Sequence, residues 1–198
     1  LQTLFSEVWE EELSESPEFA TYLGDSRYND RLTDRSLDAI QHSYEKSKSY
    51  LKRLDEMDKS KLNKENQLNY DLFEKKLNRG IEGHQFKGYL MPIDQMGGVQ
   101  INFPNLVKIT PFNNKLDYEN YLMRLDAFPE FMDQIIALMK EGIKDGLIPP
   151  KIVLRTVPEQ IDAQIVPVEE STFYKPFLEF PDDMADADCL RLTKSGTE

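Results

Sequence analysis

Apolar residues recur three and four positions apart along most of the chain, which is the spacing of one face of an α-helix. In the first fourteen residues this stripe consists of Leu1, Leu4, Phe5, Val8 and Trp9. Glutamates fall mostly on the opposite side. The pattern therefore predicts an amphipathic helix that ends near Ser14.

The sequence then signals a new start. Ser16 can cap a helix whose first residue is Pro17, where proline has no helical hydrogen bond to lose. Gly24 can adopt the left-handed conformation that commonly follows the last residue of a helix. We expect a short helix over residues 17–23, followed by a polar, turn-rich segment.

Two longer amphipathic stretches follow. Ser36 is placed to cap a helix that reaches Met57, and a second apolar stripe covers residues 64–81. A short polar link joins them. Two antiparallel helices are the simplest arrangement of such a pair.

The periodicity fails over residues 83–111, where glycines and prolines are frequent, and we expect a long irregular segment there. Helical spacing resumes at Tyr118. Because proline removes a helical hydrogen bond, Pro129 predicts a break at Phe128-Pro129 and a second helix that runs up to Gly146. The interpretation is another helical hairpin.

Residues 149–165 read as one more helix that starts at the proline pair and is kinked or divided near Pro158. An irregular, aromatic segment over residues 167–181 comes next, and Asp182-Asp183 is suited to open a final helix. The predicted class is all-α, an irregular array of helical hairpins. We assign residues 1–181 to one helical region and residues 182–198 to the start of a further helix or tail.

Charge and composition exclude several partners. The chain has 198 residues and a formal net charge of -12, and its basic residues are interleaved with acidic ones, so we expect no nucleic-acid partner. The single cysteine, Cys189, has no partner for an intrachain disulfide. No apolar run approaches the roughly 20 residues of a membrane-spanning helix, so no transmembrane segment is expected.

Sequence motifs for catalysis are missing. The chain has no HExxH zinc motif, no GxSxG nucleophile turn and no glycine-rich phosphate loop. The two histidines, His42 and His84, are about forty residues apart, and a surface or helix-end role suits each better than metal ligation. We therefore assign no catalytic residue and no metal ligand to this chain.

Other chemical side chains have simpler explanations. Carboxylate pairs such as Glu7 with Glu11 are expected on the solvated face of an acidic helix, and the acidic run at residues 182–188 lacks the glycine and glutamate of a calcium loop. Cys189 reads as a structural thiol. The aromatic segments at residues 112–131 and 173–180 favour helix packing, with a ligand wall or partner groove as the alternative.

The most unusual local sequence lies in the segment from Leu90 to Gly98, because its two adjacent glycines permit close backbone approach. The candidate substrate-lining residues are Gln95, Met96, Gly97 and Gly98. The loop can expose backbone donors to a ligand, or it can form a tight structural corner. Both interpretations stay open at this point.

Several segments, taken in order, resemble the bacterial domain-of-unknown-function family 885. They are PEFATYLGD at residues 17–25, RYNDRL at 27–32, LNYDL at 68–72, PIDQMGG at 92–98, TPF at 110–112, DYENYLMRL at 117–125 and GIKDGLIPP at 142–150. Each is weak alone, but together they span nearly the whole chain.

The resemblance implies a larger helical protein, a zinc-dependent metallopeptidase whose HExxH helix lies in a later part. The resemblance implies that this chain is the N-terminal third of that protein. The chain begins at Leu1 and ends beside a predicted helix, which is expected of such a part. Zinc would belong to the complete protein, with no cofactor held here. The expected partners are the C-terminal part of the same protein and a peptide substrate. The resemblance also implies an exported or lipid-anchored protein, for example a periplasmic one.

Two functions remain. The first is the non-catalytic N-terminal part of a zinc-dependent metallohydrolase, a peptidase, in which the chain forms a wall of the substrate cleft. The second is a non-enzymatic helical binding or scaffold domain whose aromatic grooves hold a partner helix or peptide.

Overall fold

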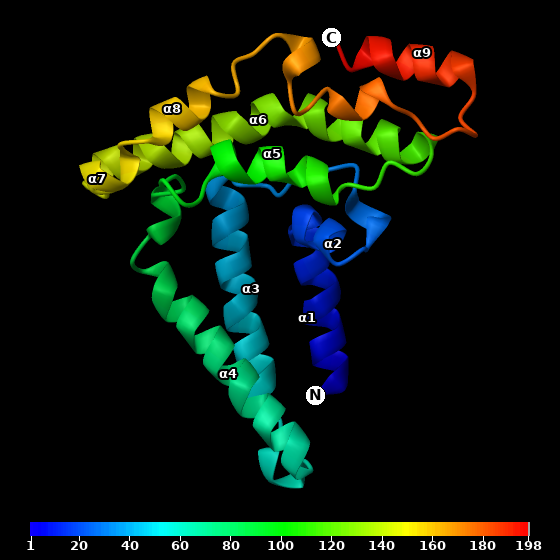
Figure 1. Ribbon diagram of the computed structural model, residues 1–198. Coiled ribbons are helices and arrows are strands. Elements are labelled where there is room, and N and C mark those ends of the chain that lie inside the picture. The colour runs from blue at the N-terminus through cyan, green and yellow to red at the C-terminus, as the bar shows by residue number, and fades with distance from the viewer. Residues whose placement is uncertain (198) are drawn as a thin grey trace.

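A computed structural model of the protein describes residues 1–197, and within that range the regular structure is entirely helical (Figure 1). The predicted all-α class is confirmed. The helices form two parts: a bundle whose free end is the connection between its two long helices, and a set of helices that lies across the other end of the bundle.

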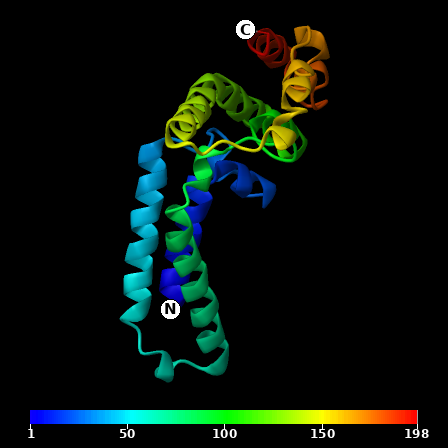
Figure 2. The same ribbon diagram turned by 90° about the vertical axis from the view of Figure 1, so that its left-hand side faces the viewer.

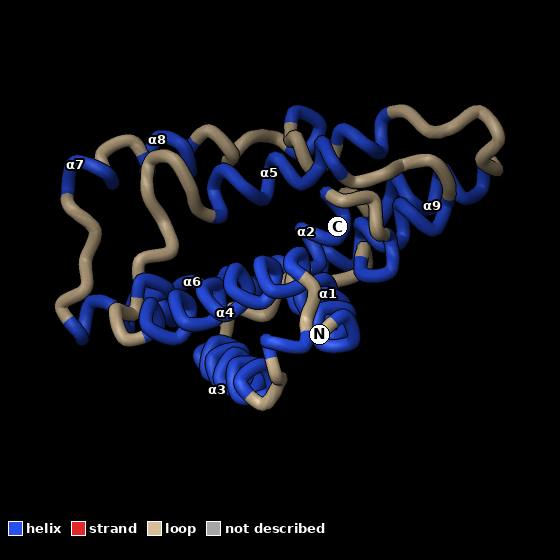
Figure 3. Tube along the Cα trace, turned by 90° about the horizontal axis from the view of Figure 1, so that it is seen from below, coloured by secondary structure: helices blue, strands red, loops and turns tan. Residues whose placement is uncertain are grey.

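The bundle consists of α1 (Gln2–Glu15), α3 (Leu37–Asp55) and α4 (Lys64–His84) (Figures 1 and 2). Its core contains Leu4 from α1, Leu54 from α3, and Tyr70 and Leu77 from α4. The predicted antiparallel pair of helices is therefore confirmed, with α1 packed against it. Figure 3, seen from below, shows the bundle nearly end-on.

Ion pairs join α1 to the other two helices. Lys46 of α3 lies 2.8 Å from Glu15 and also pairs with Glu11, while Lys76 of α4 lies 2.9 Å from Glu12. The predicted glutamate-rich face of α1 is thus largely turned toward lysines of the hairpin. Such partly exposed pairs each contribute about 0–1 kcal/mol, so the apolar core remains the main source of stability.

The helix starts and stops predicted in the first half are confirmed. The Ser36 hydroxyl accepts a hydrogen bond from the backbone N–H of Ala39 at 3.1 Å, as an N-cap should. Gly24 follows α2 (Pro17–Tyr22) with φ +84°, the left-handed conformation that favours glycine. α3 ends at Asp55, two residues before the predicted Met57.

The prediction of an irregular segment over residues 83–111 is wrong in its second half, which forms α5 (Val99–Ile109) with Pro104 inside it. Proline costs a helix interior about 3 kcal/mol, so its presence in the sequence predicts a helix break. Burial of Phe103 and Leu106 offsets this cost, because each large apolar side chain contributes roughly 1.5–3 kcal/mol.

The predicted break at Pro129 is also wrong. α6 (Lys115–Asp145) continues through it for 31 residues and ends at Gly146 with φ +72°. Buried residues lie on both sides of the proline, with Tyr121 before it and Ile135 and Leu138 after it. The two halves are therefore held in line by packing, and the predicted second helical hairpin is a single helix that crosses the top of the bundle (Figure 1).

The remaining elements line the side of α6. α7 (Lys151–Leu154) and α8 (Val157–Asp162) are separated close to Pro158, which confirms the predicted division. Short 3-10 turns follow over residues 168–178, and α9 (Asp186–Ser195) begins a few residues after the predicted start at Asp182. No helix among residues 1–197 is long and apolar enough to cross a bilayer.

Candidate functional site

A groove of about 860 Å³ lies between α2, α5 and α6. Phe131, Ile135 and Leu138 of α6 line it together with Phe103 and Leu106 of α5. Phe19 and Tyr22 of α2 also line it, with 40% and 69% of their surface exposed. Concave, largely apolar sites with a few polar groups are the usual form of a ligand site.

The polar groups of the groove come from three segments. Glu18 of α2 accepts hydrogen bonds from the backbone N–H of Thr33 at 3.1 Å and from the Thr33 hydroxyl at 2.5 Å. Asn102 and Asn105 lie one turn apart on α5 and are both exposed. Arg35, just before α3, completes the set. The lining of the groove therefore includes carboxamide donors and acceptors from α5 and two charged groups, Glu18 and Arg35.

Carboxylate and carboxamide contacts hold the Asp94–Gly98 loop in place. The Asp94 carboxylate accepts hydrogen bonds from the backbone N–H groups of Met96 at 2.7 Å and Gly97 at 2.8 Å. The Gln100 side chain donates to the backbone oxygen of Asp94 at 2.8 Å and to the Gln160 side chain at 3.2 Å. The loop is thus tied both to itself and to α8, and the arrangement is that of a tight corner.

Gly98 is the position where this corner needs glycine. Its φ is +123°, and a Cβ there would lie 2.5 Å from Gln100 Oε1 and 3.1 Å from Ile93 Cα. Gly97 has room for a Cβ, since the nearest atom is Asp94 Oδ1 at 3.9 Å. Of the two adjacent glycines only Gly98 is therefore required by the backbone conformation.

The four candidate residues of this loop do not all face the groove. Gly98 lines it, whereas Gln95 donates its backbone N–H to Val153 O at 2.9 Å and so faces α7. Met96 is 85% exposed at the tip of the loop. Contact with a substrate stays a prediction for Gln95, Met96, Gly97 and Gly98.

Sequence reasoning missed Arg124, a fully buried arginine of α6. Its guanidinium donates to the hydroxyl of Thr21 at 2.7 Å and to the backbone oxygens of Arg31 and Tyr28 at 3.0 and 3.2 Å. Burial lowers the pKa of Arg124, and the charge of Glu18 opposes that shift. A signal was available, because Arg124 occupies the apolar stripe of its helix together with Tyr121.

The side chains of residues 1–197 do not by themselves fit a zinc site. A zinc ion in a protein takes about four closely placed ligands, and residues 1–197 contain no group of three or more His, Cys, Asp or Glu side chains that could hold a metal. His84 stacks on the ring of Tyr44, with ring centroids 4.1 Å apart, and His42 is exposed on α3. No chemical step is therefore assigned to zinc on these residues.

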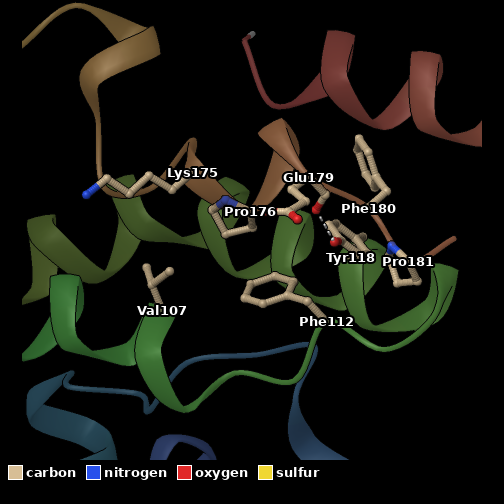
Figure 4. Close-up of a pocket in the computed structure, with 8 residues that line it drawn as sticks. All are labelled: Val107, Phe112, Tyr118, Lys175, Pro176, Glu179, Phe180 and Pro181. Carbon is tan, nitrogen blue, oxygen red and sulfur yellow. Dashed lines mark hydrogen bonds between the residues drawn. The ribbon is translucent and has the colours of Figure 1, made fainter.

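The aromatic segments predicted to pack together do so. Tyr118 and Tyr121 of α6 meet Tyr174, Phe177 and Leu192 in one core. An open depression of about 450 Å³ lies beside this core, and Figure 4 shows it lined by Phe112, Tyr118 and Phe180, with the Lys175 side chain pointing away from them. The Tyr118 hydroxyl is already used, because it donates to Glu179 O at 3.1 Å. The larger groove is the better candidate site.

Fold and groove together define an all-α protein with a ligand-sized groove between its helices. The chain belongs to the family described as bacterial protein of unknown function (DUF885), whose family model matches residues 17–196. The resemblance inferred from the ordered segments is thereby confirmed at the level of the family. Among curated proteins, none matches the chain in sequence.

Proposed function

We propose that this chain is the N-terminal, non-catalytic helical part of a zinc-dependent metallohydrolase, a peptidase, and that the groove between α2, α5 and α6 forms one wall of its substrate cleft. The catalytic zinc site belongs to another part of that protein. The chain contributes binding and orientation of the substrate.

The groove is the observation that carries this proposal. It combines an aromatic and aliphatic surface with the carboxamides of Asn102 and Asn105, which suits the apolar side chains and peptide groups of an extended peptide. Its walls are held by buried contacts, since Arg124 fixes α2 to α6 and Gln100 fixes the loop that ends at Gly98. A preorganised wall binds substrate at a smaller entropic cost.

A second function, a non-enzymatic helical domain that binds a peptide, is favoured by one specific feature. Side chains of α2, α5 and α6 within the described residues already form a concave, largely apolar surface with a few polar groups, the usual form of a ligand site. The two functions share the binding surface and differ in whether bound peptide is cleaved.

The first experiment is the intact mass of the native gene product, with its sequence past Glu198. If an HExxH helix follows, the complete protein is assayed with internally quenched peptides, with and without a zinc chelator. Cleavage that the chelator abolishes supports the metallohydrolase. A native product that ends near Glu198, or a complete protein that cleaves no peptide, contradicts it and favours the binding domain.

Two matched variants connect cleavage to the groove. Asn102→Trp fills the groove from α5, whereas Asn78→Trp makes the same change at an exposed position of α4. We expect N102W to raise KM or abolish cleavage, and N78W to leave both kinetic constants unchanged. Equal activity of the two variants, with unchanged stability, contradicts a role of the groove in substrate binding.

A further inference from the structure

The two charged residues that line the groove differ in what already binds them. Both oxygens of the Glu18 carboxylate accept hydrogen bonds from Thr33. Arg35 uses its backbone N–H to bond the Gln134 side chain at 2.7 Å, and its guanidinium has no ion pair within residues 1–197. Of the two charged side chains that line the groove, only that of Arg35 has no hydrogen-bond or ion-pair partner within the described residues.

Arg35 has no ion pair within residues 1–197 although the chain has 36 acidic residues against 24 basic ones, and unlike Arg79, which also has none there, it lines the groove. With this excess of carboxylates, Arg27, Arg31, Arg53 and Arg191 each have an acidic partner. Arg35 stands between Asp34 and Asp38 in sequence but pairs with neither, because the Asp34 carboxylate accepts the backbone N–H of Ser36 at 2.8 Å. Its guanidinium is left available to an anion bound in the groove.

The rest of the groove indicates what carries that anion. The apolar and aromatic side chains of the groove favour a ligand with bulky apolar groups. The guanidinium of Arg35 favours a carboxylate on that ligand, because the two groups can form a pair of parallel hydrogen bonds. The Asn102 side chain makes no hydrogen bond within residues 1–197, and the Asn105 oxygen accepts one from Lys108 at 2.9 Å. A carboxamide with free donors and acceptors suits a peptide group next to the carboxylate.

We propose that the groove binds the C-terminal end of a peptide with bulky apolar residues, in which the terminal carboxylate pairs with Arg35 and the adjacent peptide group bonds the side chain of Asn102. This assignment rests on the proposed function and gives its substrate a chemical class. Arg35 acts in binding and selects peptides with a free carboxylate.

The test uses the chain itself and two peptides that differ in one group. Calorimetry compares acetyl-Leu-Phe-Phe with a free carboxylate and the same peptide with a C-terminal amide. Trp9, the single tryptophan, gives a second readout because its ring contacts that of Phe19 in an edge-to-face arrangement, with centroids 6.3 Å apart. We expect the acid to bind about tenfold more tightly than the amide, as for one charge-assisted hydrogen bond.

Two arginine variants make the result specific. Arg35→Gln should abolish the preference for the acid while the amide binds as before, and Arg35→Lys should keep part of it. Arg79→Gln is the control, because Arg79 is an exposed arginine of α4 that also lacks an ion pair within the described chain. It should change neither affinity.

Each other outcome overturns the assignment. Equal binding of acid and amide, or no binding of either, removes the role of Arg35. Dodecanoate that binds more tightly than the peptide acid, with no effect of Asn102→Leu, identifies a fatty acid as the ligand. The proposed function is tested separately. A complete protein that cleaves no peptide contradicts the peptidase function, even if the groove prefers the peptide acid to the amide. Cleavage that depends on the groove, without a preference for the acid, contradicts only the role of Arg35.

Discussion

The guanidinium of Arg124 in α6 donates to the hydroxyl of Thr21 in α2 at 2.7 Å, and both side chains are buried. Thr21 in turn donates to the Asn29 side chain at 2.6 Å. This chain of bonds fixes α2 and the turn after it on α6. Because Phe19 and Tyr22 of α2 line the groove, the same contacts set the position of one of its walls.

Replacing Arg124 should therefore destabilise the protein strongly. Arg124→Met keeps much of the side-chain volume but leaves Thr21 and the backbone oxygens of Tyr28 and Arg31 without their donor. We expect a loss of about 3 kcal/mol in the free energy of unfolding, measured by urea denaturation. Arg79→Met, at an exposed site of α4, is the control and should change stability by less than about 0.5 kcal/mol. A loss below about 1 kcal/mol for R124M contradicts the buried-anchor role.

Local signals explain which parts of the fold could be predicted from the sequence. Ser36, Gly24 and Gly146 act within one turn of their own position, by capping or by a left-handed φ, and each was assigned correctly. Pro104 and Pro129 were misread because the cost of a helical proline is local, whereas the burial that offsets it comes from residues on other elements.

The groove could not be predicted for the same reason. Its walls come from segments around residues 16–40, 89–109 and 131–138, and no periodicity links them. The glycine pair was recognised as unusual, but the contact that separates Gly98 from Gly97 involves the side chain of Gln100, whose orientation depends on Gln160 of α8. Only the folded chain brings these residues together.

The two glycines of the loop should respond differently to alanine. Gly98→Ala places a side chain at φ +123°, close to Gln100 and to the backbone of Ile93, and we expect it to cost about 1–3 kcal/mol. Gly97→Ala has room and should stay within about 0.5 kcal/mol of the parent. Thermal unfolding of both variants gives the comparison. If both lose the same stability, the strain is not specific to Gly98.

Pro129 should be a site where stability can be gained. It is exposed and lies inside the continuous helix α6, so Pro129→Ala restores one helical hydrogen bond without disturbing the core. We expect a gain of about 1–2 kcal/mol, because the restored helix propensity is partly offset by the greater freedom of the unfolded chain.

Pro158 provides the matched control for that substitution. It is also exposed, but it lies in the first turn of α8, where proline has no helical hydrogen bond to lose. Pro158→Ala should therefore give no gain or a loss of about 0.5 kcal/mol. A gain at Pro158 equal to that at Pro129 in chemical denaturation would show that the helix interior is not the cause.

The buried tyrosine Tyr121 should make the protein sensitive to alkali. Burial raises the pKa of Tyr121 above its usual value near 10.0, and its hydroxyl donates to Phe173 O at 3.0 Å. Above pH about 10 the unfolded chain loses this proton while the folded protein retains it, so the free energy of unfolding falls as pH rises. Below pH about 10 the stabilising contribution is fully present.

Two phenylalanine variants identify the group responsible. Tyr121→Phe should lose about 1 kcal/mol at neutral pH, because Phe173 O loses its donor, but its stability should fall less steeply between pH 10 and 12. Tyr22→Phe is the control, because Tyr22 is 69% exposed and should leave the slope unchanged. Urea denaturation at several pH values measures both. An unchanged slope in Y121F would assign the alkaline loss to Tyr70 or Tyr118, whose pKa values burial also raises, since the same linkage applies to each of them.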